Sequence, residues 1–363
     1  MVNNDDRQPI LIYDGNCGFC GYWVRYWDRL TGPRVRYEKF QDVAGSYPDV
    51  SVEEFSRSIQ LIDRDGNRYS GANAAFRVLD SVPGNHLWLW LYQRLPGFAR
   101  VSERCYGLVA RHRIAAAKMS RWLWGKELYP DDYGLVSWVF LRFIALIYFA
   151  AFASLAVQIT GLVGADGILP FGERLDRVLE ESGRSAVWQS PTIFWLNASD
   201  FVLKAVCVFG MASSVAVFFN IFLRTGLLLC YTFYLSLVHA GQDFLAFQWD
   251  LFLLESGFLA LFLTGGSRIV IWLYRWLLFR FMFMGGVVKL ASGDPTWRNL
   301  TALKYHFETQ PLPSPMAWYA YQLPDQLLQA ATAAVFFIEL IVPFFVFMPR
   351  RLRLVAAASF LLL

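Results

Sequence analysis

The sequence predicts a small α/β domain followed by an α-helical transmembrane bundle of about six to seven spans, the last of them truncated. Hydrophobic residues make up 56% of the 363 positions and the mean hydropathy is positive, which is too apolar for an ordinary soluble protein. Apolar runs of about 20 residues, the length that crosses a bilayer, begin only near Leu135. We therefore expect domains at 1–130 and 131–363.

The first domain has the order strand, helix, strand, hairpin and further helices. Gly32-Pro33 ends the first helix, and Asp65-Gly66 between two apolar segments is a hairpin signal. This order is that of a small thioredoxin-like sheet. The expected strands are Pro9–Tyr13, Val35–Phe40, Ser58–Asp63 and Asn67–Ser70, and the expected helices are Cys17–Leu30, Ala72–Asp80, His86–Leu95 and Val101–Trp124.

The second domain is expected to cross the membrane repeatedly. The predicted spans are 135–159, 200–219, 221–238, 244–263, 269–290 and 327–348, with a seventh that starts at Leu354 and is cut short by the end of the sequence. Two less apolar segments, 161–191 and 291–325, are expected to be loops on the outer side.

Basic residues crowd the segment directly before the first span, where Glu103 is the one acid. We call this segment, 94–126, the basic collar. Its position against a span and the lack of a recognisable nucleic-acid module favour contact with anionic membrane lipids over nucleic acid. The opening MVNNDDRQP lacks the features of a signal peptide, so the positive-inside rule places the head in the cytoplasm. The collar contains Arg94, Arg100, Arg104, Arg111, Arg113, Lys118, Arg121 and Lys126.

The motif Cys17-Gly18-Phe19-Cys20 lies where the first strand turns into the first helix. A helix start favours a thiolate at Cys17, and Cys20 follows one turn later on the same side. We predict that Cys17 attacks a disulfide, that Cys20 resolves the mixed disulfide and that Asp14 assists proton transfer. The expected redox group is the Cys17–Cys20 disulfide itself, with no added cofactor.

Two other interpretations of the motif stay open. Cysteines three apart on a helix can be core residues, with Asn16 merely capping the helix. A zinc site would need Cys105 and either His86 or His112 to complete four ligands, and no second closely spaced ligand pair is present. We predict no metal.

The segment Tyr13-Asp14-Gly15-x-Cys17-x-x-Cys20 resembles the signature of the DCC family of thiol–disulfide oxidoreductases. Similar segments continue at Leu61–Gly66, Gly71–Ala74 and Tyr106–Arg113, so the resemblance covers about residues 8–125. It implies exchange with a cellular thiol reductant, glutathione or a thioredoxin-like protein. One departure from thioredoxins is that no proline directly precedes the Ser58–Asp63 strand.

The second domain contains five characteristic segments: Ala151–Leu155, Gly161–Pro170, Gln248–Asp250, Leu253–Leu259 and Lys289–Pro313. With these segments, the last of which is the most specific, residues 136–345 resemble the lipase maturation factor family. The resemblance implies help with the folding of secreted lipases, so a secreted lipase or another exported client is an expected partner. The fused head and the cytoplasmic start are typical of a bacterial inner-membrane protein.

Charged side chains inside spans cost about 2.5 to 3.5 kcal/mol each and usually face one another or a cavity. We therefore expect interior ion pairs, with Asp250 and Glu255 about 140° apart on their helix and facing different neighbours. A structural role and a proton or substrate path are both open. The candidate intramembrane polar residues are Asp250, Glu255, Arg275, Arg280 and Glu339.

The second outer loop combines Pro, Trp and Tyr with polar side chains. It is expected either to bind a client or substrate or to pack as an aromatic loop on the membrane surface. The candidate binding residues are Trp297, His306, Glu308, Gln310 and Pro311.

These features predict a membrane-bound thiol–disulfide oxidoreductase linked to the maturation of secreted proteins such as lipases. The alternative is a non-enzymatic maturation or chaperone factor whose redox head is vestigial or regulatory. A third hypothesis, an enzyme acting on lipid or quinone within the bundle, is supported only by the intramembrane charges.

Overall fold

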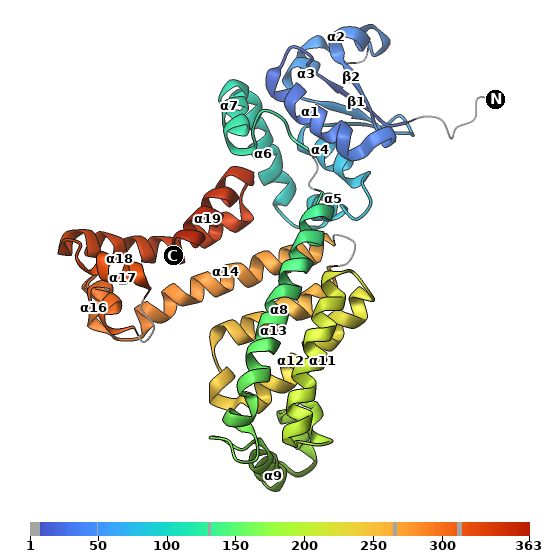
Figure 1. The fold of residues 1–363 in the computed structure, drawn as a ribbon. Helices are drawn as coiled ribbons and strands as arrows, with labels where there is room; N and C mark the ends of the chain where they lie inside the picture. The colour runs from blue at the N-terminus through green and yellow to red at the C-terminus, as the bar shows by residue number, and fades with distance from the viewer. Residues whose placement is uncertain (1–7, 49, 130–131, 264–266, 311–313) are drawn as a thin grey trace. The chain divides into compact units, whose positions relative to one another are not determined.

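Figure 1 shows a computed structural model of the chain, which describes residues 8–363 except positions 49, 130–131, 264–266 and 311–313. Residue contacts divide the chain into two units. The first holds the residues up to 131 together with 348–355, and the second holds 132–347 together with 356–363. Each unit has its own buried hydrophobic clusters.

A four-stranded mixed sheet forms the centre of the first unit, with strand order β2-β1-β3-β4. β1 runs parallel to β2 and antiparallel to β3, and β3 and β4 form an antiparallel hairpin. Leu11 of β1 lies opposite both Tyr37 and Leu61 in the register. The strands are β1 (Ile10–Tyr13), β2 (Arg36–Lys39), β3 (Gln60–Ile62) and β4 (Arg68–Ser70).

Helices of the first unit pack on both faces of this sheet. They are α1 (Gly18–Thr31), α2 (Phe40–Val43), α3 (Val52–Arg57), α4 (Gly71–Asp80), α5 (Leu87–Arg94), α6 (Phe98–Arg111) and α7 (Arg113–Trp124). Leu11 belongs to a cluster with Val24 of α1 and Val78 of α4, whereas Ile12 clusters with Phe55 of α3. Successive side chains of a strand point to opposite faces, so β1 is buried on both sides.

The strands lie within two residues of their predicted positions, and Asp65-Gly66 forms the predicted turn between β3 and β4. The single helix expected over 101–124 is wrong. α6 ends at Arg111, His112 has non-helical dihedrals (φ −113°, ψ 38°), and α7 begins at Arg113. α3 was also not expected, although its capping box of Ser51 and Glu54 is a readable sequence signal.

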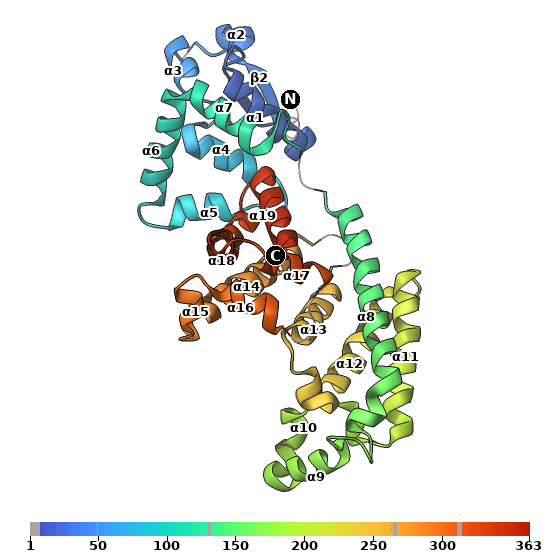
Figure 2. The ribbon, with the colours of Figure 1, turned by 60° about the vertical axis from the view of Figure 1, so that its left-hand side comes forward.

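The second unit is all-helical along its described residues. Figures 1 and 2 show α8 and α11 side by side, and α12 packs against both. Its helices are α8 (Gly134–Val163), α9 (Phe171–Ser182), α10 (Ala186–Gln189), α11 (Asp200–Phe218), α12 (Leu223–Gly241), α13 (Gln248–Ala260), α14 (Arg268–Ala291), α15 (Pro295–Arg298), α16 (Ala302–Thr309), α17 (Pro315–Tyr321), α18 (Asp325–Leu340) and the C-terminal part of α19 (Arg350–Leu362).

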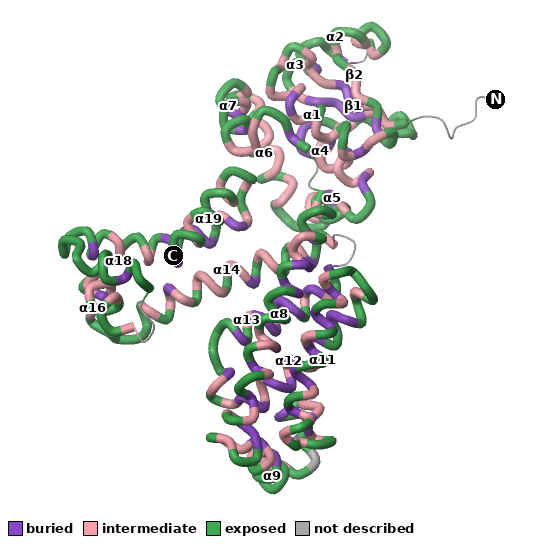
Figure 3. Tube along the Cα trace, viewed as in Figure 1, coloured by how far each residue is buried: buried purple, intermediate pink, exposed green. Residues whose placement is uncertain are grey.

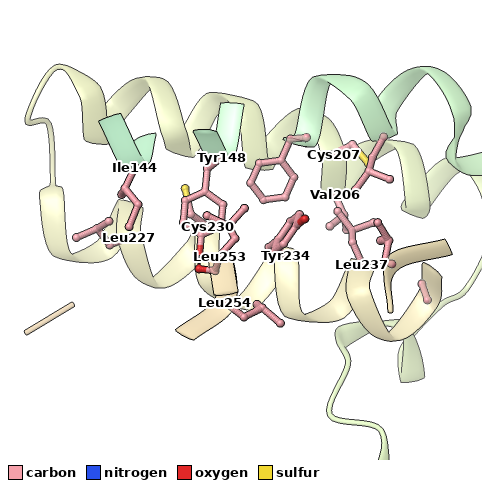
Figure 4. Close-up of a cluster of buried hydrophobic side chains, with 14 of the residues drawn as sticks. Ile144, Tyr148, Val206, Cys207, Leu227, Cys230, Tyr234, Leu237, Leu253 and Leu254 are labelled. Atoms are coloured by element: carbon pink, nitrogen blue, oxygen red, sulfur yellow. Dashed lines mark hydrogen bonds between the residues drawn. The ribbon is translucent and has the colours of Figure 1, made fainter. Parts of the chain in front are cut away.

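Buried apolar side chains, among them the rings of Tyr148 and Tyr234, fill the centre of this bundle (Figure 4). Tyr148 and Phe152 of α8 each meet the ring of Tyr234 of α12 edge-on, with centroids 5.7 and 5.8 Å away. Gly210 of α11 faces Phe152 so closely that an added Cβ would lie 2.5 Å from the ring. The small residue therefore permits the close contact of α8 and α11.

The expectation of six to seven spans is wrong. Among the residues that the structure describes, four segments are long and apolar enough to cross a membrane: 134–163, 200–218, 268–291 and 325–347. α13 has 13 residues, which at about 1.5 Å per residue is shorter than the hydrocarbon core. α12 begins with Arg224 in its first turn and ends with His239 in its last, and its middle holds several hydroxyl side chains. The segment 354–363 forms the end of α19.

The two expected outer loops contain helices. Residues 161–191 include α9 and α10, and residues 291–325 include α15, α16 and α17. Pro315 does not lie in an extended segment, because it is the first residue of α17. Pro311 and Pro313 lie outside the described residues. Figure 3 shows that much of α14 and α18 is exposed or only partly buried within this unit.

Candidate active site

Cys17 and Cys20 lie together at the start of α1. Cys17 is the N-cap residue, and its sulfur accepts a hydrogen bond from the backbone N–H of Cys20 at 3.2 Å. The Cys20 thiol also points at the Cys17 sulfur, with the two Sγ atoms 2.8 Å apart. This separation exceeds the about 2.05 Å of a disulfide, so the two cysteines form a dithiol in this structure.

The Cys20 thiol keeps its proton at neutral pH. Burial, then the hydrogen bond to Cys17 and the electrostatic influence of Cys17, raise the pKa of the Cys20 thiol to about 12. The Arg113 guanidinium opposes this shift and lowers the pKa of Cys20. Cys20 is therefore a thiol donor at neutral pH and Cys17 is the acceptor, which is the arrangement required when Cys17 reacts first.

Asp14 lies in a network at the end of β1. Its Oδ1 accepts hydrogen bonds from the backbone N–H of Asn16 at 3.0 Å and from the Gln41 amide at 2.8 Å. Its Oδ2 lies 3.6 Å from the Arg113 guanidinium. Gln41 also accepts the Gly15 N–H at 3.0 Å. Asp14 thus fixes the turn before Cys17, and Arg113 links it electrostatically to Cys20.

Arg113 is held in place by α7 and by the chain before β3. Its second guanidinium nitrogen donates to the Arg57 carbonyl at 2.7 Å. α7 in turn is fixed on α1, because Trp23 meets Trp124 edge-on at 5.6 Å and Tyr22 donates to the Gly125 carbonyl at 2.9 Å. The break between α6 and α7 therefore places the Arg113 side chain beside the dithiol.

Two cavities flank the dithiol. The first, here the basic cavity, has a volume of about 420 Å³ and is lined by Cys17, Asp14, Arg113, Lys118 and Arg121 among others. The second, here the apolar cavity, has a volume of about 320 Å³ and is lined by Cys20, Trp23, Trp27, Cys105 and Tyr106 among others. Cys17 therefore borders a cavity with several basic side chains, whereas Cys20 borders a mainly apolar one.

The residues considered for zinc do not assemble with the dithiol. Within the described residues, no three His, Cys, Asp or Glu side chains are placed to share a metal ion. His86 instead pairs with Asp80 at 2.9 Å, and Cys105 is an exposed free thiol.

Two of the acids predicted to lie in the membrane, Glu255 and Glu339, form ion pairs, whereas Asp250 bonds a tyrosine hydroxyl. Glu255 of α13 forms an ion pair with Arg280 of α14, beside a cavity of about 350 Å³. Asp250 instead accepts the Tyr234 hydroxyl at 2.6 Å, so the two acids of α13 face different neighbours. Arg275 donates to the Tyr133 hydroxyl at 2.8 Å.

Glu339 and Trp297 meet at Lys289. The Lys289 ammonium lies 2.6 and 2.8 Å from the two carboxylate oxygens of Glu339, and 5.3 Å from the Trp297 ring centroid. Trp297 also meets Phe336 of α18 edge-on at 5.8 Å. The Lys289 ammonium of α14 therefore contacts both Trp297 of α15 and Glu339 of α18.

The described residues show no contact between Trp297 and the other predicted client-binding residues. His306 and Glu308 are exposed on α16, and Gln310 is half-buried at its C-cap. Pro311 lies outside the described residues. Their role in binding stays a prediction.

A model described as the lipase maturation factor transmembrane domain matches residues 135–363. The chain belongs to the lipase maturation factor family. A second model, for DCC1-like thiol-disulfide oxidoreductase, matches residues 11–118. This member of the lipase maturation factor family is therefore an integral membrane protein that carries its dithiol in a DCC1-like head.

Relatives in the lipase maturation factor family come from several vertebrates. Lipase maturation factor 2 of Xenopus laevis is 42% identical over 253 residues, which cover 64% of this chain and 36% of the frog protein. The chicken (Gallus gallus) protein of the same name is 44% identical over 243 residues, covering 60% and 33%. Lipase maturation factor 1 of Mus musculus is 37% identical over 251 residues, covering 63% and 43%.

The chain thus spans about a third of the length of the lipase maturation factor 2 proteins it matches. No solved structure matches this lipase maturation factor family member.

Cys17, Cys20 and Asp14 were predicted from the sequence as site residues, whereas three side chains around them were not. Arg113 was counted in the basic collar and in the DCC-like segment but not as a site residue, although it lines both cavities. Gln41 and Tyr106 were not singled out as site residues, and Tyr106 accepts the Ile59 N–H at 3.0 Å beside the apolar cavity. The Tyr106–Arg113 segment of the DCC resemblance was the available signal for two of them.

Proposed function

We propose that this chain is a membrane-bound thiol–disulfide oxidoreductase, with a thioredoxin-like head, that serves the maturation of secreted proteins such as lipases. The observation that carries the proposal is the half-buried Cys17–Cys20 dithiol at a helix start, on a chain of the lipase maturation factor family. Hydrogen bonding from Cys20 prepares Cys17 as the attacking sulfur.

The reaction is an exchange of thiols and disulfides. Cys17 attacks a substrate disulfide, and the first substrate sulfur leaves as a thiolate. Cys20 then loses its proton and attacks the Cys17 sulfur, which releases the second substrate thiol and closes the Cys17–Cys20 disulfide. A cellular thiol reductant such as glutathione or a thioredoxin-like protein reopens it. Arg113 favours the Cys20 thiolate in the second step, and Asp14 positions Arg113.

For the location, we propose a bacterial inner membrane with the head in the cytoplasm. The basic collar precedes the first span, and exposed apolar side chains such as Ile114 (79% exposed) and Trp122 (61% exposed) accompany it on α7. Apolar and basic side chains on one helix suit contact with an anionic lipid surface. An exported lipase would then lie on the opposite side from the dithiol.

The test uses the full chain in detergent or lipid nanodiscs, equilibrated with glutathione redox buffers and then alkylated. Mass spectrometry of the Cys17–Cys20 peptide should show a reversible change between dithiol and disulfide. Cys17→Ser should abolish it, whereas Cys207→Ala, which removes a buried thiol in the membrane unit, should leave it intact. A pair that does not respond to the buffer would contradict the proposal.

A second candidate is a non-enzymatic maturation factor that binds clients through the segment 291–325. It is favoured by the exposure of aromatic residues there, with Trp318 at 65% and Tyr319 at 63%. In a strain or cell line where lipase secretion depends on this protein, Cys17→Ser would then keep secretion. Trp297→Ala or His306→Ala would reduce it. The opposite pattern supports the redox function.

A further inference from the structure

The basic cavity beside Cys17 differs in charge from the apolar cavity beside Cys20. Its described lining includes three basic side chains and one acid, Asp14. Asp14 lies 3.6 Å from Arg113 and offsets that charge. Lys118 and Arg121 therefore have no acidic neighbour among the described lining residues, and the cavity has an excess of positive charge next to the reacting sulfur.

Arg121 is placed directly over the start of α1. A Cβ built on Gly18, the residue after Cys17, would lie 3.5 Å from the Arg121 Nη2 atom. The N-terminus of this 14-residue helix adds a partial positive charge at the same place. A substrate that reaches the Cys17 sulfur through this cavity passes between a guanidinium, an ammonium and a helix N-terminus.

We propose that the basic cavity is the binding site for a low-molecular-weight disulfide that carries carboxylates, the chemical class of oxidised glutathione. This inference rests on the proposed redox function and names its substrate class. Lys118 and Arg121 bind the carboxylates and present the substrate disulfide to Cys17. The apolar cavity has one basic side chain, Arg113, among its described lining residues, so the anionic substrate enters from the Cys17 side.

The exchange balances with this substrate alone. The Cys17 thiolate forms a bond to one substrate sulfur, the substrate disulfide breaks, and one anionic thiol leaves. The Cys20 proton passes to solvent, the Cys20 sulfur bonds to Cys17, and the mixed disulfide breaks to release the second thiol. One substrate disulfide is reduced to two thiols while the Cys17–Cys20 dithiol is oxidised to a disulfide. The reverse reaction oxidises two anionic thiols.

The experiment compares three disulfides of different charge on the reduced full chain in neutral detergent. Oxidised glutathione is anionic, bis(2-hydroxyethyl) disulfide is neutral and cystamine is cationic. A Cys20→Ser, Cys105→Ser background traps the mixed disulfide at Cys17 and removes the other exposed thiol. Quenching with acid, followed by mass spectrometry of the Cys17 peptide, gives a rate constant for each probe.

The expected readout is the ratio of the rate constants for oxidised glutathione and the neutral disulfide. Lys118→Gln and Arg121→Gln should each lower this ratio by about threefold to tenfold, and the cationic probe should react slowest. Raising the ionic strength should shrink the ratio in the unaltered protein. Arg104→Gln removes an equally exposed charge from α6 that lines neither cavity, and it should keep the ratio.

The outcomes separate the inference from the function on which it rests. If the neutral disulfide modifies Cys17 but the ratio is the same in Lys118→Gln, Arg121→Gln and Arg104→Gln, the anionic substrate class is wrong and the redox function stands. If none of the three probes modifies Cys17, the redox function itself fails.

Discussion

At the scale of single residues, Cys20 is subject to two opposing influences. Burial and the neighbouring Cys17 sulfur keep its proton on, while the Arg113 guanidinium favours its loss. In the mixed disulfide, Cys17 no longer offers a free sulfur, but burial, the largest cause, persists. Loss of the Cys20 proton should therefore limit the second half of the exchange.

This predicts a steep pH dependence for the resolving step. Because the pKa of Cys20 is raised to about 12, its thiolate fraction should grow about tenfold per pH unit between about pH 7 and pH 9. Decay of a preformed mixed disulfide at Cys17, followed by rapid acid quenching, should accelerate accordingly. A plateau near pH 9, the usual range of a thiol, would show that Cys20 is not held protonated.

Arg113 provides the matched variant for this measurement. Arg113→Leu removes the charge that lowers the pKa of Cys20, so the thiolate fraction should fall and resolution at pH 8 should slow. Arg113→Lys retains a positive charge and should recover part of the rate. Equal rates in both variants would show that Arg113 acts by packing rather than by charge.

Glu103 stabilises the head by accepting hydrogen bonds from two other helices. Its carboxylate accepts the backbone N–H groups of Ala72 and Asn73 at 3.2 and 3.1 Å, at the start of α4. It also accepts the Tyr92 hydroxyl at 3.0 Å, and burial followed by this bond raises the pKa of Tyr92 to about 12. A side chain of α6 thus caps α4 and ties α5 to both.

Glu103→Ala should destabilise this part of the head. Two helix-end N–H groups and a hydroxyl lose their acceptor, at a cost of about 1–3 kcal/mol. Hydrogen exchange of the α4 amides should accelerate by about tenfold to a hundredfold, since about 1.4 kcal/mol corresponds to tenfold. Glu53→Ala, on the exposed first turn of α3, is the control. Unchanged α4 exchange in Glu103→Ala would rule out the cap.

At the scale of elements, the head was largely predictable because its strands are short apolar runs bounded by turn residues. The break at His112 was not, because the residues on either side are good helix formers and the apolar pattern continues across it. That break decides where α7 points, and α7 carries Arg113, Lys118 and Arg121. The dithiol could therefore be predicted from sequence, whereas the charged walls of its cavity could not.

The membrane elements show a related limit. Hydropathy detects apolar length, but a buried helix of a bundle is also apolar, so α12 and α13 resembled spans. The shortness of α13 became evident only from its observed ends at Gln248 and Ala260. The sequence predicts that charged residues in spans form ion pairs, because such charges need partners. It does not predict which residues pair, because that depends on which helices are neighbours.

The contact of α14 with α18 yields a prediction at this scale. The Lys289–Glu339 pair is mostly buried, with side-chain exposures of 25% and 11%. Removing one partner leaves an uncompensated charge, so Glu339→Gln or Lys289→Met should each destabilise the fold by about 3 kcal/mol. The double variant should lose much less than the sum of the two, as measured by unfolding in detergent.

The exposed pair of Lys304 and Asp325, 3.0 Å apart, is the control for this cycle. Solvent screens that pair, so Lys304→Met should change stability little. Additive losses in the Lys289 and Glu339 cycle would mean that the two side chains do not interact in the membrane.

At the scale of the whole molecule, the corrected span count leaves the predicted sidedness unchanged. Five spans were expected before the segment 291–325, and three of the four candidate spans found along the described residues precede it. Both numbers are odd, because α12 and α13 drop out as a pair. The fourth span then returns the basic cluster of Arg350, Arg351 and Arg353 to the side of the head, in agreement with the positive-inside rule. Residue contacts also group 348–355 with the head.

The last prediction tests this sidedness directly. With the five native cysteines replaced, a cysteine introduced by Ser314→Cys, at the exposed N-cap of α17, should react with a membrane-impermeant maleimide in intact cells. The exposed Ser46 of the head provides the opposite control, because Ser46→Cys should react only after the cells are opened. If both positions react in intact cells, or both only after lysis, the number of spans between them is even. A client at α17 and the dithiol would then share one side of the membrane, and direct exchange between them would become possible.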